Sequence, residues 1–165
     1  MGIPRNAWIT YALALAVLGL DQTSKAWVLT LPEQASIEVF WPLQITRIWN
    51  SGISFGLFQV GHDVVRWGMT LFNLGVGVLL AVWAFRQTRL PLALGFGLLI
   101  GGAVGNALDR IRLGAVVDFI DVQRLGFFPW IFNVADAAIT LGAILLLLDS
   151  LRPERPATPE APSSD

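Results

Sequence analysis

The sequence contains no cysteine, a single histidine (His62), and charged residues at only 14 % of its 165 positions. Without cysteine, disulfides, thiolate metal sites and a cysteine nucleophile are excluded. One histidine cannot build a multi-histidine metal site. Soluble domains normally carry about 25 % charged residues. The lower charged fraction of this chain, together with its 55 % hydrophobic content, indicates an integral membrane protein. The net charge of −1 argues against nucleic acid as a partner.

Four apolar segments are long enough to cross a hydrocarbon core, which requires roughly 17–25 residues. We predict membrane spans at 7–29, 67–85, 92–108 and 131–148 within one domain, 1–151. In the third span, Gly97, Gly101 and Gly105 recur every four residues. This spacing predicts one helix face that approaches a neighbouring helix closely.

The two long connections contain patterns that are typical of strands. Residues 36–40 alternate between apolar and polar side chains, residues 43–49 do so in part, and 114–122 form a similar piece in the second connection. We therefore predict a small sheet rather than an irregular interfacial loop. The proline-containing tail, 152–165, is predicted to be disordered.

The distribution of lysine and arginine predicts the orientation in the membrane. The two sides carry nearly equal numbers of these residues, but one side holds them in short flanking segments at a higher density. Basic residues in short flanks favour the cytoplasmic side. We therefore expect both termini in the cytoplasm and the two long connections, with their sheet, on the opposite side of the membrane.

Polar residues of all four predicted spans fall at one depth, because consecutive spans alternate in direction. They lie late in the first, early in the second, at the end of the third and early in the fourth span: Asp21, Asn73, Asn106 and Asp136. Asp118, in the second long connection, belongs to the same side. Ionisable residues at membrane depth usually face the interior of a bundle and mark a functional site.

Two pairs of polar residues stand four positions apart on predicted helices. Asp21 and Lys25 have the spacing of a salt bridge, for which a structural role is favoured. Asn106 and Arg110 either brace a nearby carboxylate or anchor the helix end at the headgroups. Spacing does not separate these two roles.

Two further asparagines accompany the aspartates. Asn133 is three residues before Asp136, so the two are predicted to share a helix face and to reach the same groups. Asn50 and Gly52 belong to the segment 50–56, whose glycines predict a tight turn.

Asp118 and Asp136 can form an acid–base pair if the fold brings them together. Two neighbouring carboxylates share a proton, so one takes a proton from water while the other donates to a carbonyl oxygen. A proton or ion pathway is the alternative, but the opposite half of each span has no Asp, Glu, Lys, Arg or His. A structural assembly factor would leave both aspartates without a role. A Ser24–Lys25 dyad is disfavoured, because adjacent helical residues point in different directions.

Five short motifs occur in order among the predicted spans: DQTSK (21–25), NSGISFG (50–56), GGAVGNALDR (101–110), VVDFID (116–121) and FNVAD (132–136). With them, the chain resembles the bacterial lipoprotein signal peptidases (signal peptidase II, prolipoprotein signal peptidase). The resemblance implies an all-α integral membrane protein, a bundle of four transmembrane helices with a small periplasmic β-sheet cradle.

The same resemblance implies an aspartic endopeptidase of the bacterial inner membrane. Such an enzyme removes the signal peptide from diacylglyceryl-modified prolipoproteins by cutting before the lipidated cysteine. Its catalytic residues are expected to be Asp118 and Asp136. The residues expected to bind substrate or support the site are Asp21, Lys25, Asn50, Gly52, Asn106, Arg110 and Asn133. The aromatic side chains of Phe55, Phe119 and Phe132 are expected to shield the two aspartates. Trp130 is a further neighbouring aromatic residue, for which a role at the membrane interface is favoured.

The expected partners are lipid-modified prolipoproteins and membrane lipids. Neither a metal nor an organic cofactor is expected, and no obligate protein partner is predicted.

Overall fold

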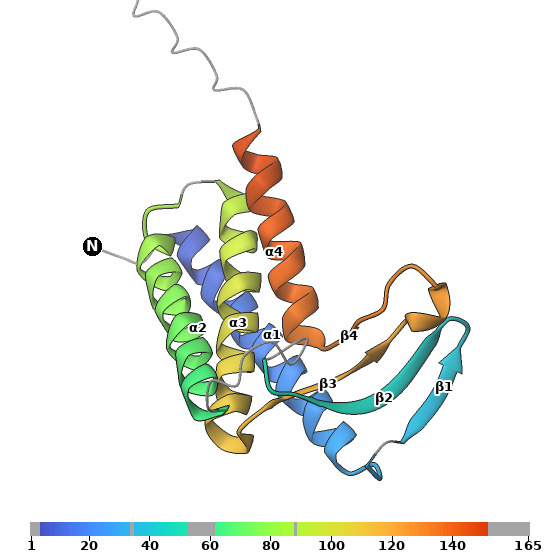
Figure 1. Cartoon of the computed structure of the whole chain (residues 1–165). Helices are drawn as coiled ribbons and strands as arrows, with labels where there is room; N and C mark the ends of the chain where they lie inside the picture. Colours follow the sequence, from blue (N-terminus) through green and yellow to red (C-terminus); the bar gives the residue numbers. More distant parts are fainter. Residues whose placement is uncertain (1–3, 34, 53–61, 88, 152–165) are drawn as a thin grey trace, which may run out of the picture.

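The computed structural model describes residues 4–33, 35–52, 62–87 and 89–151. Its helices and strands are α1 (Arg5–Leu29), β1 (Ser36–Phe40), β2 (Leu43–Asn50), α2 (His62–Ala84), α3 (Leu90–Leu113), β3 (Val116–Asp121), β4 (Ile131–Phe132) and α4 (Val134–Ser150). The helices lie side by side, and the strands form an antiparallel sheet beside one end of them (Figure 1). The predicted tail, 152–165, lies outside the described residues.

Helix α3 is central, because it packs against α1, α2 and α4. Its glycines make the approach of α1 possible. A Cβ atom on Gly101 would come within 2.7 Å of the backbone oxygen of Ala14, and one on Gly105 within 2.6 Å of the Asp21 carboxylate. Gly97 meets the backbone of α1 in the same way. The predicted glycine face is therefore confirmed.

Two of the helices are long and apolar enough to cross a membrane, at Asp63–Ala84 in α2 and Leu90–Leu113 in α3. Helix α1 carries a buried aspartate and a buried lysine, Asp21 and Lys25, and α4 has only 17 residues. The prediction of four transmembrane spans is thus supported in part, and the crossings by α1 and α4 stay predictions.

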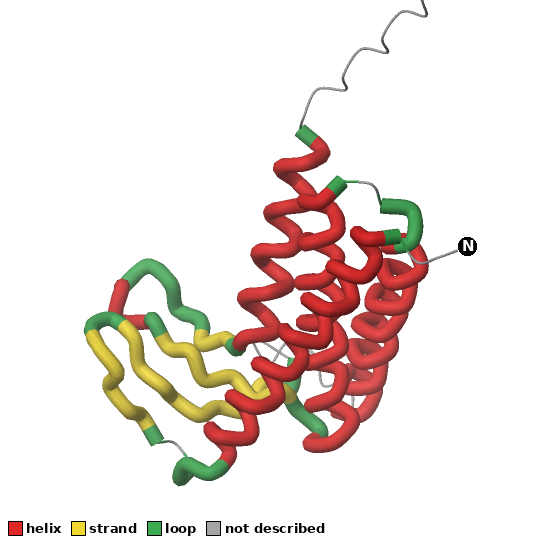
Figure 2. The backbone as a smooth tube through the Cα atoms, turned by 180° about the vertical axis from the view of Figure 1, so that it is seen from behind, coloured by secondary structure: helices red, strands yellow, loops and turns green. Residues whose placement is uncertain are grey.

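The sheet has the strand order β1-β2-β3-β4. It projects from the end of the helices opposite to the start of α1 and the end of α4 (Figures 1 and 2). Side chains alternate along β3, so Val117 and Phe119 pack with Val28 in a core between α1 and the sheet, whereas Asp118 points to the other face. The expectation that Phe119 shields the aspartate pair is therefore wrong.

Three of the predicted spans differ from the observed helices by three residues or more at one end. The fourth was expected to begin at Ile131, but Ile131–Phe132 form β4, and α4 begins after Asn133. Hydropathy cannot distinguish an apolar strand from the first turn of an apolar helix. The third continues to Leu113, where Gly114 ends it with a φ of 87°. The second begins earlier than predicted, at His62.

Candidate active site

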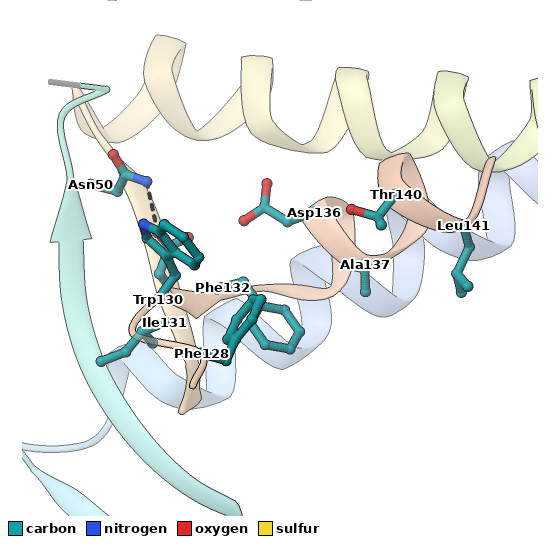
Figure 3. A pocket seen from close by; sticks show the side chains of 10 residues that line it. Asn50, Phe128, Trp130, Ile131, Phe132, Asp136, Ala137, Thr140 and Leu141 are labelled. Atoms are coloured by element: carbon teal, nitrogen blue, oxygen red, sulfur yellow. Dashed lines mark hydrogen bonds between the residues drawn. The ribbon is translucent and has the colours of Figure 1, made fainter. Parts of the chain in front are cut away.

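Asp118 is placed by β3 and held by two asparagines. Its side chain is only 1 % exposed. The Asn50 amide, at the end of β2, donates to one carboxylate oxygen at 2.8 Å (Figure 3). The Asn133 amide donates to the other oxygen at 2.6 Å. A buried carboxylate is costly unless it is hydrogen-bonded, and these two donors meet that requirement.

Asp136 is placed by the first turn of α4. Asn133 is the N-cap residue, and its side-chain oxygen accepts a hydrogen bond from the Asp136 backbone N–H at 2.9 Å. The Asp136 carboxylate accepts in return from the Asn133 backbone N–H at 3.3 Å. This capping box fixes the carboxylate at a helix N-terminus, where negative charge is favoured. The Asn106 amide donates to the same carboxylate at 2.8 Å.

Asn133 bridges the two aspartates. Its amide nitrogen binds Asp118, while its oxygen and backbone bind Asp136. The predicted proximity of Asn133 and Asp136 is confirmed, although Asn133 precedes the helix rather than sharing its face. Both aspartates line one cavity of about 610 Å³, whose other residues are Asn50, Phe128, Trp130, Ile131, Phe132, Ala137, Thr140 and Leu141 (Figure 3).

The pKa of Asp118 is raised to about 6, first because the side chain is buried and second because of the negative charge of Asp136. The hydrogen bonds from Asn50 and Asn133 stabilise the ionised form and oppose the increase. Repulsion between two such carboxylates lets the pair hold a single shared proton. The site can therefore present one acid and one base to the same cavity.

Behind Asn106 lies a buried ionic cluster. Lys25 donates to the Asn106 side-chain oxygen at 3.2 Å and forms ion pairs with Asp21 at 2.9 Å and Asp109 at 2.8 Å. The predicted Asp21–Lys25 salt bridge is confirmed. Because Lys25 occupies the oxygen of Asn106, the amide nitrogen is left to face Asp136. Asp21 also accepts from the backbone N–H of Ala135 in α4 at 2.9 Å.

Asp109 is a residue of this cluster to which the sequence analysis assigned no role. Its carboxylate accepts from Lys25, from the Gln22 amide at 2.9 Å and from the Val117 backbone N–H at 3.2 Å. It therefore ties α1 to the strand that carries Asp118. The sequence pattern that could have pointed to Asp109 is its spacing of three residues from Asn106, which places both side chains on one side of α3.

Arg110 is 5 % exposed, and it donates to the Asn106 backbone oxygen at 3.3 Å. Its burial rules out the alternative of a headgroup anchor. Among the described residues, its Nε has no hydrogen-bond partner.

Gly52 lies nearby with a φ of 83°, and its N–H donates to the Asn50 side chain at 2.8 Å. A Cβ atom there would overlap the Met69 sulfur and come within 3.8 Å of Arg110, so the predicted turn requires glycine.

Two of the aromatic residues named from the sequence belong to the site. Phe132 and Trp130 line the cavity, Phe55 falls outside the described residues, and in the described part of the chain Asn73 makes no hydrogen bond to the cluster. Among those same residues, no three His, Asp or Glu side chains are grouped to hold a metal ion. The absence of a cofactor stays a prediction.

Comparisons with known proteins point to one family. The family model described as Signal peptidase (SPase) II matches residues 13–152. The chain is 48 % identical to a lipoprotein signal peptidase of Caulobacter vibrioides over 93 % of each chain. It is 41 % identical to that of Methylorubrum extorquens over 92 % of this chain and 88 % of the other.

Two solved structures described as bacterial membrane enzymes have the same fold. Both are 30 % identical in sequence, with TM-scores of 0.75 and 0.76. They match over 86 % and 87 % of this chain, and over 87 % and 92 % of their own chains. The chain therefore belongs to the signal peptidase II family, membrane proteases that process lipoproteins.

Proposed function

We propose that the protein is an aspartic endopeptidase that removes the signal peptide from diacylglyceryl-modified prolipoproteins. It cuts the peptide bond before the lipidated cysteine, with Asp118 and Asp136 as the acid–base pair. The observation that carries this proposal is the position of Asn133, which binds both carboxylates at the wall of one cavity.

The arrangement suits hydrolysis by an activated water molecule. The ionised carboxylate takes a proton from water as the water oxygen attacks the scissile carbonyl carbon, and the protonated carboxyl donates to the carbonyl oxygen. The tetrahedral intermediate then collapses, the C–N bond breaks, and a carboxyl group protonates the leaving amine. The pKa of Asp118, raised to about 6, supports a proton shared between the pair near neutral pH.

Supporting residues hold this pair in position. Asn50 and Gly52 form the turn against Asp118, while Asn106 binds Asp136 and is itself oriented by Lys25. Asp21 and Arg110 complete the support for Asn106 and the start of α4. These residues act as positioning groups in the proposed mechanism.

The substrate is held by its own signal segment and acyl chains in the membrane. The apolar part of the 610 Å³ cavity continues along the first turns of α4, at Ala137, Thr140 and Leu141 (Figure 3), which supports binding of an apolar group beside the carboxylates. All four helices cross the inner membrane in this proposal. Both termini are cytoplasmic, and the site and sheet lie at the periplasmic face. Membrane lipids and the prolipoprotein are the only partners required, and the chemistry proposed uses no metal.

The test is cleavage of a synthetic diacylglyceryl-modified precursor by purified protein in the presence of a chelator. Asp118→Asn and Asp136→Asn should each lower kcat at least about a hundredfold, because either change removes a proton acceptor or donor from the transition state. Asp63→Asn is the matched control, since Asp63 is 86 % exposed and should retain activity. Unchanged cleavage by either active-site variant, or loss of cleavage on chelation, would contradict the mechanism.

A further inference from the structure

Asp118 lies where two cavities meet. Besides the cavity along α4, a second cavity of about 260 Å³ opens over the sheet. The two cavities share Asn50, Asp118, Trp130 and Ile131. The remaining residues of the second, which we call the sheet cavity, are Ile48, Trp49, Ser51, Gln123 and Pro129.

The two cavities differ in chemistry and direction. The larger one follows α4 into the helices and is lined by phenylalanines and by Ala137 and Leu141. The described residues that line the sheet cavity come from β2 and the residue after it, from β3 and from 123–131, with none from α1 to α4, and they include the polar residues Ser51 and Gln123. Gln123 is held in the cavity wall, because its amide donates to the Pro129 backbone oxygen.

A substrate cut at Asp118 has two sides of unlike character. The signal segment before the scissile bond and the acyl chains on the cysteine just after it stay in the membrane, whereas the chain that follows this cysteine leads into water. We propose that the sheet cavity binds the first residues of the mature chain after the lipidated cysteine, an inference that rests on the proposed function. The larger cavity then receives the lipidated cysteine and the signal side.

The charges around the sheet cavity indicate which residues it accepts. Among the described residues of its lining, Asp118 is the only ionisable one. The nearby basic residues are engaged elsewhere, since Arg47 binds the carbonyl oxygen of Leu31 at 2.8 Å and Arg124 binds Glu38 at 2.7 Å. Arg110 interacts electrostatically with Asp118 and Asp136 but does not line this cavity, so a carboxylate bound here would meet the charge of Asp118 with no cation in the cavity wall. The sheet cavity therefore selects uncharged polar residues and disfavours acidic ones.

The test compares precursors that carry Ser or Asp directly after the lipidated cysteine. For each enzyme the measured quantity is the ratio of kcat/KM for the Asp precursor to that for the Ser precursor, so a general loss of activity cancels. In the wild type this ratio should be below one. Gln123→Lys places an ammonium group in the wall and keeps a donor for Pro129, and it should raise the ratio roughly two- to fivefold.

Gln44→Lys is the matched control, because Gln44 lies on the same sheet outside the lining of either cavity, and it should leave the ratio unchanged. If Gln123→Lys folds poorly, Ser51→Lys tests the same cavity without the Pro129 contact. If both lining variants leave the ratio at its wild-type value while the Ser precursor is cut, the subsite is wrong and the proposed function stands. An equal change with Gln44→Lys also overturns the subsite. If the wild type cuts neither precursor, the proposed function fails, and the subsite with it.

Discussion

Two asparagines stabilise the ionised form of Asp118, because each donates a hydrogen bond to a different carboxylate oxygen. They differ in what else they hold. Asn133 also caps α4, so its loss would displace Asp136. Asn50 instead binds the N–H of Gly52 in the turn that follows β2. Asn50 is therefore the residue at which the pKa of Asp118 can be altered with least effect on its partner.

We expect Asn50→Ala to move the pH profile of kcat/KM to higher pH. A donated hydrogen bond stabilises the ionised carboxylate and lowers the pKa, so removing it raises the pKa of Asp118 above its value of about 6. A hydrogen bond to a charged group contributes about 1.5–3 kcal/mol, and we expect the limb that reports Asp118 to shift upward by about one unit. Asn73→Ala, the control, should leave both the plateau and the midpoint of the pH profile unchanged. A lower plateau with an unmoved midpoint would show that Asn50 only supports the turn.

At the scale of the elements, α3 determines the distances at which the other helices lie. Glycines on two of its sides admit a neighbour's backbone. Gly101 faces the backbone of α1 and Gly102 that of α4, where a Cβ atom would lie within 2.7 and 2.5 Å of a carbonyl oxygen. Gly105 instead faces the carboxylate of Asp21, which holds both Lys25 and the start of α4. Close packing and the ionic cluster therefore depend on the same helix surface.

Gly105→Ala should destabilise the protein by about 1–3 kcal/mol, because the added methyl group overlaps the Asp21 carboxylate and forces α1 and α3 apart. Gly75→Ala in α2 is the matched control, since a Cβ atom there meets nothing within 4 Å. It should be neutral or stabilising by up to about 1 kcal/mol through the lower backbone entropy of the unfolded chain. Thermal unfolding in detergent measures both changes, and equal effects of the two substitutions would contradict the packing described for Gly105.

At the scale of the whole molecule, the sheet and the two chain ends of the helical body lie at opposite ends of the helices (Figure 1). This arrangement follows from an even number of helices that alternate in direction. If all four cross the membrane, the sheet is exposed on one side, and the beginning of α1 and the end of α4 on the other. The ion pairs that satisfy Asp21 and Lys25 inside the protein remove the main electrostatic objection to burying α1 at membrane depth.

The absence of cysteine makes this topology directly testable. In spheroplasts, a membrane-impermeant maleimide should label Ser36→Cys on β1 and should not label Ser150→Cys at the end of α4 until the membrane is permeabilised. Both serines are exposed, so a difference in labelling reports the side of the membrane rather than burial. Labelling of both positions in intact spheroplasts would contradict the predicted orientation, and the unmodified protein serves as the blank.

Much of this architecture was predictable because it depends on patterns that are local in the chain. Apolar length located the four helices, alternation located β1, β2 and β3, and glycine spacing located the close face of α3. The alternation of helix direction placed Asp21, Asn106 and Asp136 at one level, and hydrogen bonds do link these residues through Lys25 and Ala135. The start of α4 was missed because Ile131 and Phe132 are as apolar as the helix that follows.

The sequence by itself therefore determined the class of protein, the order of its elements and the shared level of its acids along the helices, because hydropathy and periodicity act within a few turns of chain. Only the tertiary structure decided which groups hold those acids. Asn133 bridges both carboxylates, Asp109 joins Lys25 to the strand of Asp118, and Phe119 faces the core rather than the site. The contacts of Asn133 with Asp118, of Lys25 with Asp109 and of Phe119 with Val28 join different elements of the fold. The directions of these side chains follow from strand register and helix capping in three dimensions.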